Sequence, residues 1–148
     1  MKNRILTMMI GLPMAGKSTW ISENLGDQFI ISAVYLRKYF SGQDYYEPAE
    51  PIVWAIRKYL LETVLCQGFD VIVDETNLYV KKRADMITLA RKYRYKVDCV
   101  YIDTDKSICI KRAGDNIPLI KAINKMDRYR EAPCMEEGFI NINEVKIK

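Results

Sequence analysis

Residues 11–19, Gly-Leu-Pro-Met-Ala-Gly-Lys-Ser-Thr, match the phosphate-binding pattern GxxxxGK[ST]. An apolar run at 5–10 precedes them and a helix-compatible segment follows, which is the strand-loop-helix context that this pattern requires. In such a loop the backbone N–H groups and the first helical turn converge on a phosphate. We expect Lys17 to contact the β- and γ-phosphates of ATP and Ser18 to bind Mg²⁺. The predicted nucleotide-binding residues are Gly11, Pro13, Met14, Ala15, Gly16, Lys17, Ser18 and Thr19.

A second group of candidates is the acidic pair Asp74-Glu75, which ends the apolar run at 71–73. In a fold with a phosphate loop this strand lies next to the first, so Asp74 is predicted to hold Mg²⁺ beside Ser18, directly or through water. An acid at a strand end is also a common turn or helix-cap residue. Glu75 has two interpretations, a carboxylate that activates a nucleophile or a solvated residue that begins the next turn.

The composition excludes several classes of site. The chain has no histidine, so no imidazole can act as a base, and its four cysteines lack the CxxC spacing of a zinc site. They are interpreted as reduced thiols of the core in a cytoplasmic protein. Met1 is followed almost at once by the first strand, which leaves no room for a signal peptide, and no apolar run is long enough for a membrane span. The net charge of +4 is compatible with nucleic acid or nucleotide partners.

Apolar runs alternate with helical patterns along the 148 residues, which predicts a three-layer α/β domain with a mostly parallel sheet. The length suits a single domain over residues 1–148. The predicted strands are residues 4–10, 28–32, 69–74 and 97–102, with a further one near Val145. The predicted helices are residues 17–25, 33–40, 52–67, 80–95, 103–112 and 119–130, with breaks at 41–51 and 113–118. In the helix at 80–95, Val80, Ala84, Ile87 and Ala90 are expected to face the core, with the basic residues around the remainder.

Several stretches together resemble the 5′-hydroxyl polynucleotide kinase family and, more broadly, the small P-loop kinases of phage and bacteria. They are residues 11–19, Asp-Glu-Thr-Asn-Leu at 74–78 followed by Lys-Lys-Arg at 81–83, Ile-Lys-Arg at 110–112, and Glu-Gly-Phe at 137–139. The resemblance covers nearly the whole chain, and it implies a P-loop kinase-like fold with a short lid over the nucleotide. It further implies that Asp74 lies in the active site, that Arg112 belongs to the lid, and that Arg37 binds the phosphate of the acceptor strand. Arginine suits both tasks because its planar fork binds phosphate oxygens in pairs.

The sequence departs from this family on the acceptor side. Where the family has an aspartate that accepts the proton of the attacking hydroxyl, this chain has Val34, and no carboxylate occurs between Asp27 and Asp44. The second lid arginine is also missing after Arg112. A positioned base is worth about 10²–10⁴-fold in rate. Three explanations are open. Another acid replaces this base, and the candidates are Glu75, Asp44 and Glu47. Otherwise the acceptor differs, or the protein binds and hydrolyses nucleotide without efficient transfer.

Tyr45 and Tyr46 lie in the loop beside the expected acceptor cleft, where their rings could stack on bases or pack within their own loop. The basic residues at 80–95 could follow a phosphate backbone or form a solvated helix face. The leading hypothesis is an ATP- and Mg²⁺-dependent kinase that phosphorylates a hydroxyl, foremost a 5′-hydroxyl of a nucleic-acid end or nucleotide-like acceptor. The alternatives are an NTPase that uses Asp74 and Glu75, and a nucleotide- or nucleic-acid-binding module with impaired catalysis.

Overall fold

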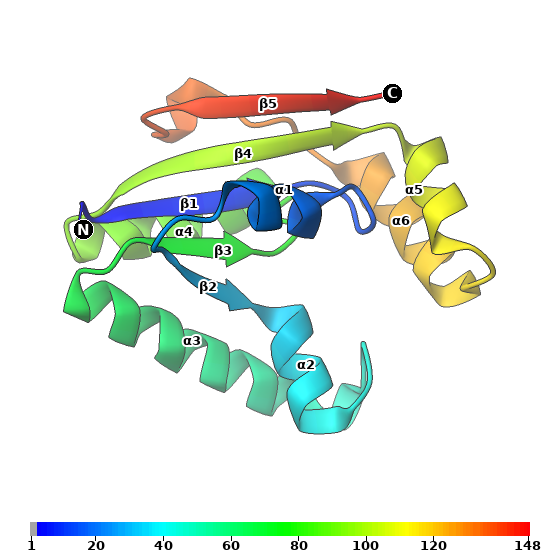
Figure 1. Ribbon diagram of the computed structural model, residues 1–148, viewed down its shortest axis with the longest axis horizontal. Helices are drawn as coiled ribbons and strands as arrows, with labels where there is room; N and C mark the ends of the chain where they lie inside the picture. Colours follow the sequence, from blue (N-terminus) through cyan, green and yellow to red (C-terminus); the bar gives the residue numbers. More distant parts are fainter. Residues whose placement is uncertain (1–2) are drawn as a thin grey trace.

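A computed structural model describes residues 3–148, and its centre is a five-stranded sheet in which every strand pair is parallel (Figure 1). Across the sheet the order is β2 (Phe29–Ser32), β3 (Val71–Asp74), β1 (Ile5–Ile10), β4 (Lys96–Thr104) and β5 (Ile142–Ile147). Since all strands run in one direction, their carboxyl ends lie along one edge. Residues that follow β1, β3 and β4 therefore meet there.

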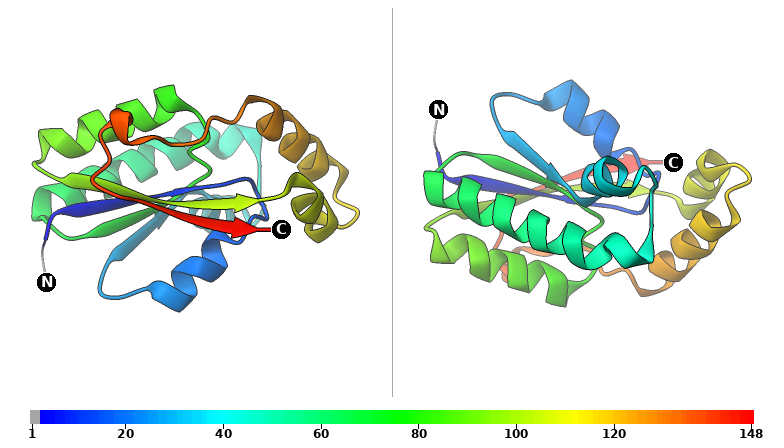
Figure 2. Two further views of the ribbon diagram at one scale, coloured as in Figure 1. Left: turned by 90° about the horizontal axis from the view of Figure 1, so that it is seen from above. Right: turned by 90° about the horizontal axis from the view of Figure 1, so that it is seen from below.

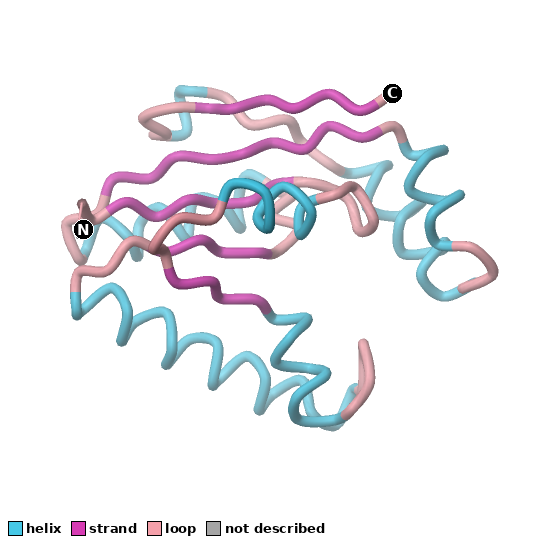
Figure 3. The backbone as a smooth tube through the Cα atoms, in the orientation of Figure 1, coloured by secondary structure: helices cyan, strands magenta, loops and turns pink. Residues whose placement is uncertain are grey.

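The helices are α1 (Lys17–Asn24), α2 (Ala33–Ser41), α3 (Glu50–Gln67), α4 (Val80–Lys92), α5 (Lys106–Ala113) and α6 (Ile117–Tyr129), with short 3₁₀ turns η1 (Glu47–Ala49) and η2 (Met135–Glu137). Figure 2 shows α1 on one side of the sheet and α3 and α4 on the other. The backbone in Figure 3 shows α5 and α6 beyond the carboxyl ends of the strands. The predicted three-layer α/β fold with a parallel sheet is confirmed.

The central strands are buried on both faces, which explains their nearly continuous apolar sequence. Leu6, Met8, Met9 and Ile10 of β1 have no exposed surface, and all four residues of β3 are buried. Met8 pairs with Val73 on one side and with Cys99 on the other. This core fixes the register of β1 against its neighbours. It thereby also fixes the point at the edge of the sheet where the phosphate loop begins.

Two helices begin earlier than predicted, for the same reason. Pro51 and Pro118 were expected to lie outside helices, yet α3 begins at Glu50 and α6 at Ile117, each with proline in its first turn. Proline is tolerated there because the first N–H groups of a helix have no intrahelical partner. At α6 the Asn116 side chain accepts a hydrogen bond from Leu119 N–H and caps the helix. The break lies at residues 114–116, so the predicted break at 113–118 began one residue too early and extended two residues too far.

Two further predictions about burial are wrong in part. In α4, Ala84 is exposed, whereas Arg83 is completely buried together with Met86, Ile87 and Ala90. The cysteines also differ: Cys99 and Cys109 are buried, but Cys66 and Cys134 are exposed. No disulfide joins any of the four thiols, which lie in the part of the chain that the structure describes.

Candidate nucleotide and acceptor site

The phosphate loop between β1 and α1 has the backbone of an anion site. Ala15 N–H donates to Leu12 O at 3.1 Å, and Met14 and Gly16 have φ angles of 66° and 110°. A left-handed conformation is costly for a residue such as Met14, and such strain is concentrated where a backbone binds a ligand. Gly16 caps α1, so the unpaired N–H groups of the first helical turn face the same loop.

The loop is fixed by its neighbours on both sides of β1. Gly11 N–H donates to Thr76 O at 3.0 Å, and the Thr104 hydroxyl donates to Ala15 O at 2.7 Å. A Cβ on Gly11 would lie 2.9 Å from the carbonyl oxygen of Ile102, closer than side chains normally approach a backbone atom. Glycine is required at this position because β4 passes so near.

The Lys17 ammonium lies inside the phosphate loop, where it is predicted to contact the phosphates of ATP. Its Nζ donates to Gly11 O at 3.0 Å and to Leu12 O at 2.8 Å. Burial lowers the pKa of Lys17 to about 8, although the nearby Asp74 carboxylate acts in the opposite direction. A phosphate that replaced the two carbonyl groups would give the ammonium a charged partner.

Ser18 and Asp74 come together where β1 and β3 end. Their oxygens, Oγ and Oδ2, are 3.5 Å apart, which is longer than an ordinary hydrogen bond between oxygens. Burial raises the pKa of Asp74, with the charge of Lys17 opposing the shift. No three His, Cys, Asp or Glu side chains within residues 3–148 gather as a metal site. Magnesium commonly takes one or two protein oxygens and completes its shell with phosphates and water, so this pair fits it.

Glu75 is neither solvated nor free. Its carboxylate accepts hydrogen bonds from Arg57 Nε at 2.8 Å and Nη2 at 3.0 Å, and Lys82 Nζ lies 3.5 Å away. Only 3% of the side chain is exposed. The solvated interpretation is therefore wrong, and both oxygens are already occupied by cations.

Arg112 of α5 reaches the phosphate loop, although it is nearly 100 residues away in sequence. Its Nη1 donates to Met14 O at 3.0 Å and to Ala15 O at 3.2 Å. The same nitrogen lies 3.8 Å from the position of a Cβ on Gly16. The structure thus brings Arg112, Lys17, Ser18 and Asp74 to one loop.

The acceptor-side candidates lie on α2, apart from the loop. Ser32 caps this helix by accepting a hydrogen bond from Tyr35 N–H, which puts Val34 in the first turn with 47% of its surface exposed. Arg37 follows one turn later, and its Nε and Nη2 both donate to the Glu50 carboxylate at 2.9 Å. Arg37 is therefore paired with α3 rather than with the phosphate loop.

The other candidates between α2 and α3 are exposed. Asp44 forms a solvent-exposed ion pair with Lys38 at 3.4 Å, and Glu47 begins the η1 turn. Tyr45 and Tyr46 are 62% and 47% exposed. Neither acid is held by contacts that would direct it toward the phosphate loop.

One residue that sequence reasoning assigned to the helix surface is central to the architecture of the site. The buried Arg83 donates from Nε to Glu137 Oε1 at 2.8 Å and from Nη1 to Asn77 O at 2.9 Å. Asn77 has a φ of 47° and donates from Nδ2 to Met9 O at 2.8 Å. Arg83 thus holds the turn that carries Thr76, the anchor of Gly11. The sequence offered one signal for this contact: Lys-Lys-Arg at 81–83 and Glu-Gly-Phe at 137–139 both belong to the stretches that resemble the kinase family.

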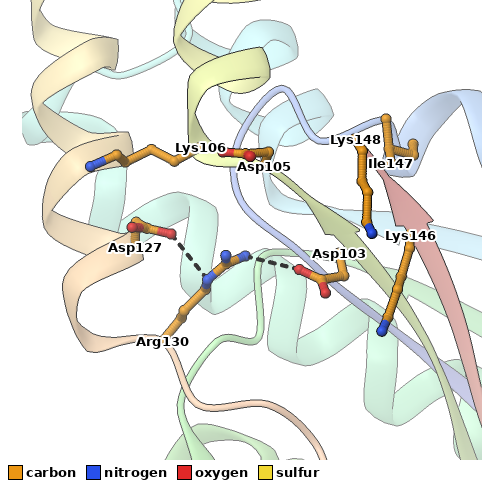
Figure 4. A pocket seen from close by; sticks show the side chains of 8 residues that line it. All are labelled: Asp103, Asp105, Lys106, Asp127, Arg130, Lys146, Ile147 and Lys148. Carbon is orange, nitrogen blue, oxygen red and sulfur yellow. Dashed lines mark ion pairs between the residues drawn. The ribbon is translucent and has the colours of Figure 1, made fainter.

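A pocket of about 380 Å³ lies at the carboxyl ends of β4 and β5, beside α5 and α6 (Figure 4). Arg130 spans it, with Nε 3.1 Å from Asp127 Oδ1 and Nη1 3.6 Å from Asp103 Oδ1. The other lining residues are Asp105, Lys106, Lys146, Ile147 and Lys148. Its charges of opposite sign partly compensate one another, and none of the predicted site residues lines it.

No helix within residues 3–148 has the length and apolar character needed to cross a membrane.

The curated relatives of this chain include two kinases, both longer than the chain. L-seryl-tRNA(Sec) kinase from Methanococcus maripaludis is 29% identical over 124 residues, which covers 77% of this chain and 48% of the relative. The bifunctional polynucleotide phosphatase/kinase of Schizosaccharomyces pombe is 24% identical over 151 residues, which covers 97% and 34% respectively. The chain spans about half or less of the length of these relatives.

Solved structures share the fold. Mycobacterium tuberculosis APS kinase CysC, determined with AMPPNP and APS, superimposes with a TM-score of 0.62 at 13% identity, covering 94% of this chain and 87% of that one. A comparison with protein families matches residues 6–115 to the family described as AAA domain (AAA_33). Because the match covers most of the sequence, the chain belongs to this family.

Proposed function

We propose that the protein is an ATP- and Mg²⁺-dependent kinase that transfers the γ-phosphate to a hydroxyl, foremost the 5′-hydroxyl of a polynucleotide or nucleotide-like acceptor. The observation that carries the proposal is the convergence of Lys17, Ser18 and Asp74 on a strained loop, with Arg112 reaching the same loop. The two kinases among the relatives support transfer rather than binding alone. The similarity to a polynucleotide phosphatase/kinase favours a polynucleotide 5′-hydroxyl as the acceptor.

Each residue of the site would have a separate task. The loop N–H groups and Lys17 would bind the phosphates, while Ser18 and Asp74 would hold Mg²⁺. The metal would neutralise charge on the phosphate oxygens. Arg112 would stabilise the charge of the transferring group, because its planar guanidinium can donate two hydrogen bonds to phosphate oxygens. Arg37 would bind the acceptor.

In the reaction, the acceptor oxygen forms a bond to the γ-phosphorus as the bond from that phosphorus to the β-γ bridging oxygen breaks. ADP leaves with the electron pair, and the acceptor hydroxyl loses its proton. Val34 cannot accept this proton, and Glu75 is occupied by Arg57 and Lys82. Since the transition state of phosphoryl transfer is loose, alignment and charge neutralisation supply most of the acceleration, with the proton passing to solvent late.

A second candidate function is nucleotide binding with impaired transfer, and Val34 is the observation that favours it. An NTPase that uses Glu75 to activate water is less well supported, because that carboxylate is held by two cations.

Transfer from labelled ATP to a 5′-hydroxyl oligonucleotide tests the proposal. We expect transfer by the wild type, loss of at least about 10²-fold in Lys17→Ala through the missing phosphate contact, and unchanged transfer in Lys58→Ala, an exposed lysine of α3. Failure of the wild type to phosphorylate any acceptor, or full activity in Lys17→Ala, would contradict it. ATP binding without transfer, with activity gained in Val34→Asp, would establish the second candidate.

A further inference from the structure

Exposed apolar side chains gather along one border of the sheet, where β2 is the outermost strand (Figure 1). Two of them belong to β2 itself, and the others belong to α2, which follows it directly, and to α3, which contacts it. Between 39% and 83% of the surface of each residue is exposed. We call these residues the β2 face: Phe29, Ile30, Tyr35, Tyr39, Phe40 and Leu60.

The members of the β2 face form one surface. A groove of about 330 Å³ lies in its middle, and Ile30, Tyr35 and Leu60 are among the residues that line this groove. Tyr39 follows Tyr35 by four residues, so it continues the same side of α2 by one turn. The Phe40 ring packs edge-on against the Tyr39 ring, with 4.9 Å between their centres. The apolar surface therefore extends from β2 across the groove to the end of α2.

The β2 face is larger than the apolar patches that monomers usually expose. With about 200 Å² for a complete aromatic side chain, the exposed fractions of its six members amount to roughly 700 Å². The largest apolar patch of a typical monomer measures about 300–600 Å², and a stable protein interface buries about 800 Å² on each partner. The face therefore has nearly the area that one side of a stable interface needs.

The two borders of the sheet differ in charge. The strand at the other border, β5, carries Glu144 and Lys146, and charged side chains of this kind keep an edge strand from pairing with other chains. In β2, residues Phe29–Ser32, no side chain is charged. Only the border at β2 thus lacks this protection, which favours a partner that covers it.

The absence of charge from the β2 face indicates which partner fits it. The charged residues of α2 are already compensated, because Arg37 pairs with Glu50 at 2.9 Å and Lys38 with Asp44 at 3.4 Å. A strongly acidic or basic partner would therefore find no opposite charge here. In a symmetrical dimer each residue lies near the same residue of the other copy, so a charged centre would repel itself. An uncharged, aromatic surface suits a second copy of this chain.

We propose that the protein is a symmetrical homodimer in which the β2 faces of two copies pack against each other about a twofold axis. Arg37 is two residues from both Tyr35 and Tyr39, which puts it about 200° around α2 from these rings. The dimer therefore buries the side of α2 that faces away from Arg37, and the proposed acceptor side stays open. The inference goes beyond the proposed function and does not depend on it.

Sedimentation equilibrium over a range of protein concentrations tests the proposal, because it gives the mass and the Kd of the dimer without ATP or an acceptor. The main variant is Tyr35→Glu, in the first turn of α2, where a carboxylate is favourable for the helix. Tyr39→Glu, at the most exposed position of the face, is a second variant in case the first alters folding. The matched control is Tyr129→Glu, an exposed tyrosine at the end of α6. Circular dichroism checks that each variant is folded.

We expect the wild type to have twice the mass of one chain at micromolar concentrations. Tyr35→Glu should raise the Kd of the dimer at least about 100-fold, because both copies lose a buried ring and the two new carboxylates lie near each other. Tyr39→Glu should act in the same direction, and Tyr129→Glu should leave the Kd within about twofold of the wild type. A wild type that stays monomeric at all concentrations, or equal Kd values for Tyr35→Glu and Tyr129→Glu, would overturn the proposal.

Other occupants of the β2 face give different results. A monomeric wild type that binds a single-stranded oligonucleotide, with weaker binding in Tyr35→Glu than in Tyr129→Glu, would assign the face to nucleic acid and overturn the dimer. The two proposals also fail separately. A dimer that Tyr35→Glu dissociates, without transfer to any acceptor, would support the interface and contradict the kinase. Transfer by a chain that remains monomeric would support the kinase and overturn the interface.

Discussion

At the scale of single residues, Lys17 and Arg112 both donate to carbonyl groups of the loop whose ligand they are proposed to bind. Phosphate oxygens would compete with backbone carbonyls for these donors, and they would win because they carry charge. The positive form of each side chain is the one that binds. Lys17, with a pKa of about 8, loses this form as the pH rises.

The lowered pKa of Lys17 predicts a pH dependence of ATP binding. Above pH 8 the free protein holds Lys17 increasingly in its neutral form, and at pH 9 about one molecule in ten is protonated. Bound phosphates favour the ammonium, so binding must take up a proton. We expect the Kd for ATP to rise roughly tenfold between pH 7 and pH 9, measured by calorimetry. In Lys17→Arg the Kd should be flat over this range, and a flat profile in the wild type would contradict the role of Lys17.

At the scale of secondary-structure elements, the contact between α4 and the segment after α6 is the support of the site. Arg83 of α4 has no exposed surface, and its partner Glu137 belongs to η2 near the end of the chain. Through Asn77 this pair holds the turn after β3, to which the phosphate loop is bonded. The segment around residue 137 therefore supports the site through Arg83.

Removal of Glu137 should be strongly destabilising, because it leaves a buried guanidinium without its counter-charge. We expect Glu137→Ala to lower the free energy of unfolding by about 3–5 kcal/mol, determined from urea denaturation. Glu136→Ala, one residue earlier and exposed, should change it by less than about 0.5 kcal/mol. A similar small loss in both variants would show that the pair at Arg83 is not what holds the turn.

The same elements show what sequence reasoning could and could not predict. The loop at residues 11–19 and Asp74 were predictable because a short motif specifies local backbone, and β1 and β3 are neighbours in this class of fold. The burial of Arg83 and the double pairing of Glu75 were not, because each depends on a partner distant in sequence. Helix periodicity alone put Ala84 inward and Arg83 outward. The helix starts at Glu50 and Ile117 were missed because the prolines that follow them, Pro51 and Pro118, were treated as helix breakers.

At the scale of the whole molecule, the sheet joins distant parts of the chain into one core. Buried apolar residues from Leu6 to Phe139 form a single cluster, and β1 from the beginning of the chain lies between β3 and β4. This arrangement supports the prediction that residues 1–148 fold as one domain.

One domain implies one cooperative unfolding transition. We expect urea curves recorded by tryptophan fluorescence, which reports on Trp20 in α1 and Trp54 in α3, to coincide with curves recorded by far-ultraviolet circular dichroism. Repeating the fluorescence measurement in Trp20→Phe isolates the signal of α3. Midpoints that differ between the two probes would show that the helices on the two faces of the sheet unfold independently.

The central place of β1 also has a consequence for synthesis on the ribosome. Ile5 pairs in register with Lys96, 91 positions later, and Leu6 with Val71, 65 positions later. At about 5–20 residues per second, roughly 5–20 s pass before β4 has been made. During that interval the apolar strand at 5–10 lacks both of its neighbours, so β1, which is made before β3 and β4, is completely paired only after β4 has followed. Newly synthesised chains are therefore expected to need chaperones that bind this unpaired apolar strand.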